Sequence, residues 1–159
     1  MKRIINLDSN RQKEFFRDAS FKTKIPISMI EKDFWVCWSL SRIFGNRQLN
    51  RILRFKGGTS LSKAFHLIER FSEDIDLILD WRLVTQEDPL LSRSNAQQDK
   101  FNKRIQEESA DYISHQLKEQ IAAVFDEECQ VTADEEDGHI IWIEYPHERA
   151  IGYILPRVK

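Results

Sequence analysis

Apolar positions recur every three or four residues in two stretches near the amino end of the chain. The first stretch predicts a helix over residues 8–22, and Pro26 interrupts the pattern. A second helix is predicted to begin at Ser28, because Ser28-x-x-Glu31 fits a capping box. Its apolar positions form one face, and Gly45 is predicted to end it.

The middle of the chain alternates between short apolar runs and one helical run. "RILRFK" (51–56) predicts a short strand, which the pair Gly57-Gly58 ends. "TSLSKAFHLIER" (59–70) predicts a helix with one apolar face. "SEDIDLILD" (72–80) predicts a second strand. The order is therefore strand, glycine pair, helix, strand.

The rest of the chain predicts helices followed by hairpins. Residues 82–96 are polar and loop-like, and residues 97–127 predict one long helix or two. "CQVTAD" and "HIIWIEYP" alternate as strands do, with the polar turn 135–138 between them, and "AIGYILPRVK" predicts another strand. We expect an α+β (α/β) fold, in which helices pack on a mixed sheet.

The chain is expected to form one domain over residues 1–159, with N-terminal helices over 1–47 and a core of sheet and helices over 48–159. A hydrophobic content of 41% and a charged content of 31% are typical of a soluble globular protein. No apolar run reaches the ~20 residues that cross a bilayer. Cys37 and Cys129 suggest no disulfide framework, so a cytoplasmic location is expected.

The net charge of −2 conceals an uneven distribution. Residues 1–70 carry 15 Lys and Arg against 6 Asp and Glu, whereas residues 71–159 carry 9 against 20. A basic half indicates a polyanionic ligand, and it is equally consistent with charge compensation inside one domain. Both interpretations stay open on charge alone.

Asp74 and Asp76 interrupt the apolar strand predicted over residues 72–80. Side chains alternate along a strand, so the two carboxylates are expected on one face, roughly 7 Å apart at their Cα atoms. Two ionised carboxylates this close are costly unless a cation lies between them. Mg²⁺ takes oxygen ligands and shares them with phosphates, and two such ions can assist phosphoryl transfer. We therefore predict a site for two Mg²⁺ ions at Asp74 and Asp76.

The glycine pair supplies the second half of the predicted site. Gly57 and Gly58 let the backbone approach a ligand closely. The N–H groups at the start of the next helix suit a phosphate, and the hydroxyls of Thr59 and Ser60 can add hydrogen bonds. Lys63 lies about one turn further on and could reach the same phosphates. These residues are predicted to bind the triphosphate of an NTP.

Each feature alone has a simpler explanation. A Gly-Gly pair is usually only a turn, Asp-x-Asp is common on solvated strand edges, and Lys63 alone is a solvated helix residue. Asp33 is a weaker candidate to face the site. The order of the features favours a nucleotide and metal site over these alternatives.

The strings "FKGGTSLSKAF", "IERFSEDIDL" and "IEKDFWVCW" make the chain similar to the AbiEii-type nucleotidyltransferase toxins. These toxins belong to abortive-infection, type IV toxin–antitoxin systems and to the DNA polymerase β-like superfamily. The resemblance implies Mg²⁺-dependent transfer of a nucleotide from an NTP to RNA, in some members tRNA, and a cognate antitoxin partner. It assigns metal binding to Asp74 and Asp76, and catalytic phosphate contact to Lys63.

The sequence departs from the family pattern in one important respect. The superfamily uses a third acidic residue on a later strand, which in this family would follow a strand like "YILPRVK" at the end of the chain. Glu144 is the in-chain substitute, and a solvated strand position is the simpler interpretation of it. The family's C-terminal helical region is also expected to be absent. A shortened, inactive homologue that binds a nucleotide or an antitoxin therefore stays open, as does transfer to a protein hydroxyl or a small molecule.

Overall fold

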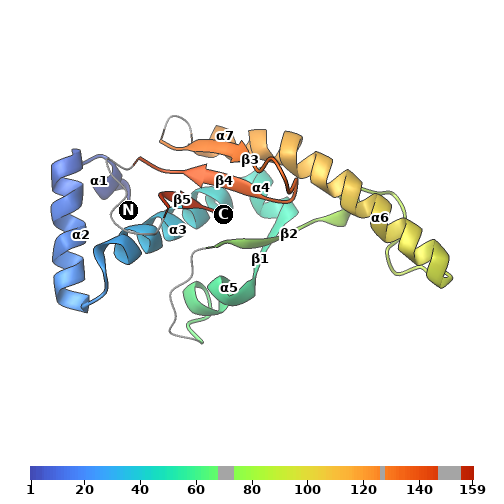
Figure 1. Cartoon of the computed structure of the whole chain (residues 1–159), viewed down its shortest axis with the longest axis horizontal. Coiled ribbons are helices and arrows are strands. Elements are labelled where there is room, and N and C mark those ends of the chain that lie inside the picture. Colours follow the sequence, from blue (N-terminus) through green and yellow to red (C-terminus); the bar gives the residue numbers. More distant parts are fainter. Residues whose placement is uncertain (68–73, 126–127, 147–154) are drawn as a thin grey trace.

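The structure is a computed structural model that describes residues 1–67, 74–125, 128–146 and 155–159. Helices and two small antiparallel sheets make up these residues, which confirms the α+β class. Figure 1 shows an elongated molecule with the sheets between two helical ends. Within the part of the chain that the structure describes, no helix is long and apolar enough to cross a membrane.

Four helices form the amino-terminal part: α1 (Lys2–Ile5), α2 (Ser9–Thr23), α3 (Ile27–Gly45) and α4 (Arg47–Ile52). The periodicity therefore predicted α2 and α3 correctly. The six-residue helix α4 was not predicted, because it is too short to show an apolar period. Its sequence signal is Asn46, whose side chain accepts hydrogen bonds from the first-turn N–H groups.

The predicted capping box at the start of α3 is wrong. The helix begins at Ile27, and Pro26 occupies the N-cap position without a side-chain hydrogen bond. Ser28 therefore lies inside the first turn, where its hydroxyl cannot cap. Proline suits this position because its fixed φ and missing N–H cost the helix start nothing.

The predicted strand, glycine pair, helix and strand are all present in the middle of the chain. They are β1 (Leu53–Lys56), α5 (Gly57–Lys63) and β2 (Asp76–Leu79). The strands pair antiparallel, with Leu53 opposite Leu79 and Lys56 opposite Asp76. The helix is shorter than predicted, and the parts of the predicted helix and strand over 68–73 lie outside the described residues.

A 3₁₀ turn, η1 (Trp81–Leu83), leads into a loop and then into a long helical stretch. This stretch contains α6 (Asn95–Tyr112), the π-helical turn η2 (Ile113–Leu117) and α7 (Lys118–Phe125). Ser94 and Gln97 form a capping box at the start of α6. Figure 1 shows α6 extending away from the rest of the molecule, whereas α7 packs beside the second sheet.

The second sheet contains β3 (Gln130–Ala133), β4 (Ile141–Glu144) and β5 (Arg157–Val158), in that order and antiparallel. The residues of the predicted last strand over 151–154 lie outside the described part. The N–H of Ile75 donates to the carbonyl of Lys159 at 2.9 Å. The residue after β5 therefore joins the second sheet to the residues just before β2.

Aromatic side chains from distant parts of the sequence build the core beside α3. Trp35 stacks on Tyr145 with ring centroids 5.0 Å apart, and Trp38 contacts Phe125, which is fully buried. Such aromatic pairs bury large apolar areas and add specific packing. These pairs connect α3 with α7 and the end of β4. Apolar side chains of the first sheet pack against the same core.

Candidate functional site

The glycine turn between β1 and α5 lies directly against one of the predicted metal-binding carboxylates. Gly57 has a φ of +75°, a conformation that L side chains rarely adopt. A Cβ atom at Gly57 would overlap the carboxylate of Asp76. The structure therefore brings Asp76 to the start of α5, and it explains why a residue without a side chain is needed there.

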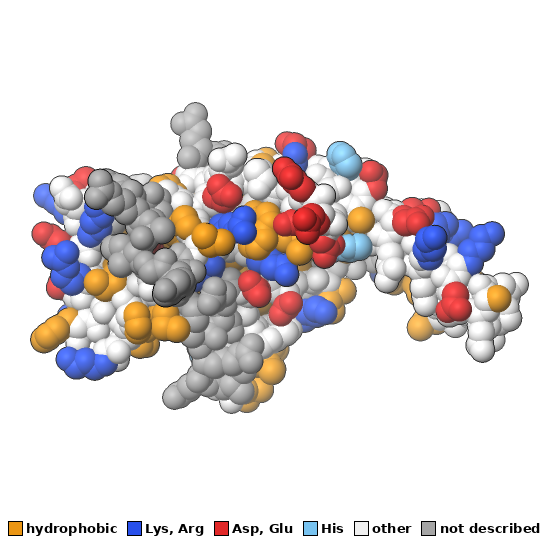
Figure 2. Space-filling view, viewed as in Figure 1, with side chains coloured by type: hydrophobic (Ala, Val, Ile, Leu, Met, Phe, Trp, Pro, Cys, Tyr) orange, Lys and Arg blue, Asp and Glu red, His pale blue; other side chains and the backbone are white. Residues whose placement is uncertain are grey.

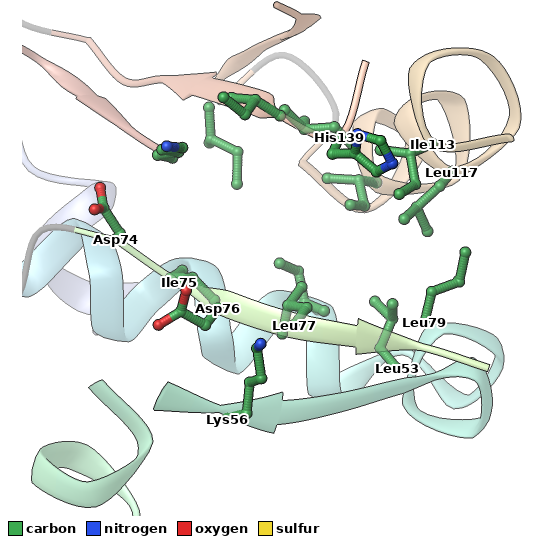
Figure 3. Close-up of a pocket in the computed structure, with 16 residues that line it drawn as sticks. Leu53, Lys56, Asp74, Ile75, Asp76, Leu77, Leu79, Ile113, Leu117 and His139 are labelled. Carbon is green, nitrogen blue, oxygen red and sulfur yellow. The ribbon is translucent and has the colours of Figure 1, made fainter. Parts of the chain in front are cut away.

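Asp74 and Asp76 are both exposed, and Ile75, Leu77 and Leu79 on the alternate positions are half-buried. The exposure pattern thus matches the prediction. The direction of the side chains differs, because β2 begins only at Asp76. In Figure 3, the carboxylate of Asp76 is directed to the α5 side, and that of Asp74 to the opposite side of the strand. A shared cation would require Asp74 to adopt another rotamer.

The two hydroxyls predicted to contact phosphate are buried and hold the local backbone. Thr59 is 3% exposed, and its Oγ1 donates to the carbonyl of Asp74 at 2.6 Å. Ser60 is 5% exposed, and its Oγ donates to the carbonyl of Gly57 at 2.9 Å. The two hydroxyls therefore hold the backbone of the glycine turn and of Asp74 in place. The backbone N–H groups of Thr59 and Ser60 are the donors that could bind a ligand.

Lys63 forms an ion pair with Asp33 of α3. The two side chains are 23% and 34% exposed, so the pair lies at the edge of the protein interior. Lys63 is the last residue of α5, and its ammonium is directed to α3. Lys56 is the nearer cation by sequence register, because it lies directly across the first sheet from Asp76.

A cavity of about 290 Å³ lies between the two sheets. Aliphatic side chains of β2, η2, α7 and β4 form most of its wall, and Lys56, Asp74, Asp76, His139 and Lys159 complete it. Figure 2 shows apolar side chains near the middle of one face of the molecule, with acidic and basic side chains around them. The apolar side chains of β2 thus border the cavity. The helix α5, which begins at Gly57, contacts β2 near Asp76.

Among the described residues, no group of three or more His, Cys, Asp or Glu side chains is arranged to hold a metal ion. Glu144 lies in β4 opposite Arg157. It is the neighbour of Ile143, which lines the cavity, so alternation places Glu144 on the other face. Glu144 therefore does not join Asp74 and Asp76.

The donor set that is present still fits Mg²⁺. This ion keeps several waters and is commonly bound by one or two carboxylates together with substrate phosphates. Asp74 and Asp76 supply two exposed carboxylates, and the Asp76 carboxylate occupies the space beside Gly57 that a Cβ atom would fill. The arrangement suits a metal ion that arrives with a phosphate ligand better than a resident metal.

Two charged residues of α3 belong to the surroundings of the site. Asp33 contacts Lys63, and Lys32 is 4% exposed and donates to the carbonyls of Leu155 and Arg157. No local pattern reveals these contacts, because their partners lie 30 residues or more away in sequence.

Burial raises the pKa of the Cys37 thiol, and the negative charge of Asp33 raises it further. Cys37 is one helical turn from Asp33, on the side of α3 near Lys63. A thiol with a raised pKa is mostly protonated near neutral pH and is a poor nucleophile. The Cys37 thiol therefore has little thiolate character beside the site.

The family model described as "Nucleotidyl transferase AbiEii toxin, Type IV TA system" matches residues 38–159. The chain belongs to this family. The match includes the glycine turn, α5 and both aspartates. No curated protein and no solved structure gives a significant match. Membership makes the chain a nucleotidyltransferase toxin of a type IV toxin–antitoxin system, with a nucleotide substrate and an antitoxin counterpart.

Proposed function

We propose that this AbiEii-family protein transfers a nucleotide from an NTP to a hydroxyl of RNA, with tRNA as the expected acceptor, in a Mg²⁺-dependent reaction in the cytoplasm. The observation that carries the proposal is the contact between the Asp76 carboxylate and Gly57. It joins an acid that can hold a cation to a turn that can admit a phosphate. Family membership supplies the reaction class.

Asp74 and Asp76 are the residues proposed to hold Mg²⁺, with the remaining positions left to water and phosphate oxygens. The bound ion supplies charge neutralisation at the triphosphate and at the attacking hydroxyl. Asp76 is already beside the glycine turn, so it is proposed as the principal ligand. Asp74 completes the site after a change of side-chain rotamer.

The glycine turn is proposed to bind the triphosphate through its backbone. Gly57 and Gly58 leave room for phosphate oxygens, and the first-turn N–H groups of Thr59 and Ser60 have no side-chain cap competing for them. Lys63 is proposed to contact phosphate while it keeps its ion pair with Asp33, because an ammonium group has three N–H donors. These groups act by positioning and electrostatics, which is how most phosphoryl-transfer sites work.

The direct test is incubation of the purified chain with each of the four labelled NTPs, Mg²⁺ and total tRNA. Label in tRNA is expected, and it should disappear when EDTA is added. Asp76→Asn should abolish labelling, and the matched control Asp99→Asn, an exposed acid on α6, should not. Full activity of Asp76→Asn would refute the assignment of the site.

A second function is favoured by one observation, the absence of a third acidic ligand among the described residues. In that case the chain binds an NTP, or its antitoxin, without transferring a nucleotide. This alternative would be supported if NTP binds at equilibrium in a way that depends on Asp76 and no label is transferred to tRNA. Label that migrates with protein or with a small molecule would instead keep the enzyme and change its acceptor.

A further inference from the structure

Two consecutive residues of α3, Lys32 and Asp33, contact the structures on either side of the segment that carries Asp74. We propose that both are positioning residues for Asp74: Lys32 acts through β5, and Asp33 acts through α5. Both residues precede the segment that the family model matches. The kinetic consequences rest on the proposed function, whereas the structural consequences do not.

Lys32 is a lysine with a buried ammonium. It is 4% exposed, and its Nζ donates to the carbonyl of Leu155 at 3.4 Å and to that of Arg157. A buried charge is costly unless hydrogen bonds satisfy it. The backbone carbonyls that lead into β5 supply these bonds, so Lys32 holds this part of the backbone close to α3.

The strand β5 in turn determines where Asp74 lies. Val158 is fully buried and pairs with Ile143, so the strand is fixed in the second sheet. The following residue, Lys159, accepts a hydrogen bond from the N–H of Ile75 at 2.9 Å. Since Ile75 directly follows Asp74, β5 sets the backbone on the carboxyl side of this aspartate.

Asp33 reaches the same aspartate from the other side. Its partner Lys63 is the last residue of α5, and Thr59 of that helix donates its hydroxyl to the carbonyl of Asp74 at 2.6 Å. The ion pair therefore holds α5 against α3, and α5 holds the Asp74 carbonyl. The strand β5 contacts α3, and Figure 1 shows α5 below them in this view.

The backbone around Asp74 is thus held by β5 and by α5, and each of these elements contacts one of two neighbouring residues of α3. Trp35 and Trp38 of that helix are buried in the core, so α3 is also held by packing that does not involve Lys32 or Asp33. Loss of either contact should shift the segment around Asp74 while the core remains folded. This distinguishes a positioning role from a contribution to overall stability.

Hydrogen exchange of the folded protein tests the Lys32 branch without any activity measurement. In Lys32→Met, exchange of the Ile75 amide should accelerate on the order of tenfold, the loss that accompanies one hydrogen bond to a charged group. Amides of α7 should keep their protection, and Lys103→Met on α6 serves as the matched control. Unchanged exchange at Ile75, or equal acceleration in α7, would overturn this branch.

Kinetics add a readout for each residue. Lys32→Met should lower kcat by about tenfold with little change in KM, and Lys32→Arg should restore part of the loss because it keeps a buried donor. Asp33→Asn should raise KM for NTP about two- to fivefold, as expected for a half-exposed ion pair, and Asp33→Glu should restore it. Equal effects of conservative and disruptive substitutions would contradict a positioning role.

The two proposals fail in different ways. If the wild-type chain labels no acceptor, the proposed function fails, and hydrogen exchange at Ile75 and in α5 still decides the present inference. If Asp76→Asn abolishes transfer while Lys32→Met and Asp33→Asn behave as wild type in exchange and kinetics, the inference fails and the function stands. If Lys32→Met does not fold, Asp33→Asn still tests the Asp33 branch through exchange in α5 and through KM for NTP.

Discussion

The core beside α3 and the β1–α5–β2 segment use their buried positions in opposite ways. The core buries indole, phenol and phenyl rings such as Trp35, Tyr145 and Phe125. The β1–α5–β2 segment instead buries the hydroxyls of Thr59 and Ser60 and exposes two acids. The first region therefore stabilises the fold, and the second region is the one that we propose to contact the ligand.

Each region should therefore respond to substitution in its own way. Changes in the core should reduce the free energy of unfolding, and activity should be lost only as a result. Changes in the β1–α5–β2 segment should reduce activity by much more than they reduce stability. The four substitutions and conditions that follow test this comparison, from the largest expected effect on stability to the smallest.

Phe125→Ala should have the largest effect on stability. Phe125 is fully buried against Trp38, and removal of a buried ring leaves a cavity that neighbouring side chains fill only in part. A loss of about 3–5 kcal/mol in the free energy of unfolding is expected. Urea denaturation followed by circular dichroism measures it. A loss below about 1 kcal/mol would show that this core is not what holds the domain together.

Gly57→Ala tests the contact at the glycine turn. An Ala residue at a φ of +75° costs about 1–2 kcal/mol, and its Cβ forces the Asp76 carboxylate away. Since that carboxylate is the end of a flexible side chain, the stability cost should stay modest while transfer activity falls by about a hundredfold or more. Thermal melting and the tRNA-labelling assay report the two quantities. Retained activity would place the reaction elsewhere.

Thr59→Val removes one hydroxyl and keeps the shape of the side chain. The Asp74 carbonyl then loses its donor inside the protein, so a loss of about 1 kcal/mol is expected. Activity should fall further than this loss explains, because the same carbonyl belongs to a proposed metal ligand. The comparison uses kcat per folded molecule. A decrease in activity no larger than the decrease in folded fraction would contradict the proposed role.

Acid pH should have the smallest of the four effects, at the turn between β3 and β4. The indole N–H of Trp142, followed by the backbone N–H groups of Asp137 and Glu136, lowers the pKa of Asp134 below its ordinary value of 3.8. A lowered folded-state pKa stabilises the native protein above the unfolded-state pKa. This contribution is lost as the pH falls through the folded-state pKa.

Denaturation midpoints measured from neutral pH to below 3.8 should therefore decline less in Asp134→Asn than in the wild type. The turn lies on the surface and apart from α5, so transfer activity at neutral pH should be unchanged. Parallel curves for the two proteins would show that the Trp142 contact is not retained in solution.

Local pattern predicted most helices and strands but not their ends. The apolar period predicted α2 and α3, whose buried faces are long enough to show it. The start of α3 was misplaced because Pro26 occupies the N-cap position, so Ser28 lies inside the first turn. The buried residues at the two ends of the π-helical turn, Tyr112 and Leu117, are five positions apart, and the apolar Ile113 between them hides this offset in the sequence.

The sequence predicted the residues of the candidate site but not the distant residues that contact the elements around it. The glycine pair and the two aspartates were identified from type and spacing, and the structure brings Asp76 to Gly57. Their assignment to nucleotide and metal stays a prediction. The contacts of Lys32 and Asp33 could not be predicted, because tertiary packing alone determines which distant backbone or side chain an α3 residue meets.

The bond between the Ile75 N–H and the Lys159 carbonyl has a practical consequence for work with this protein. A purification tag fused behind Lys159 would start beside Asp74 and crowd the approach of a nucleotide. A tag before Met1 would avoid that crowding and leave the aspartates accessible. Assays that compare the two tag positions should find lower transfer activity in the protein that is tagged at the carboxyl end.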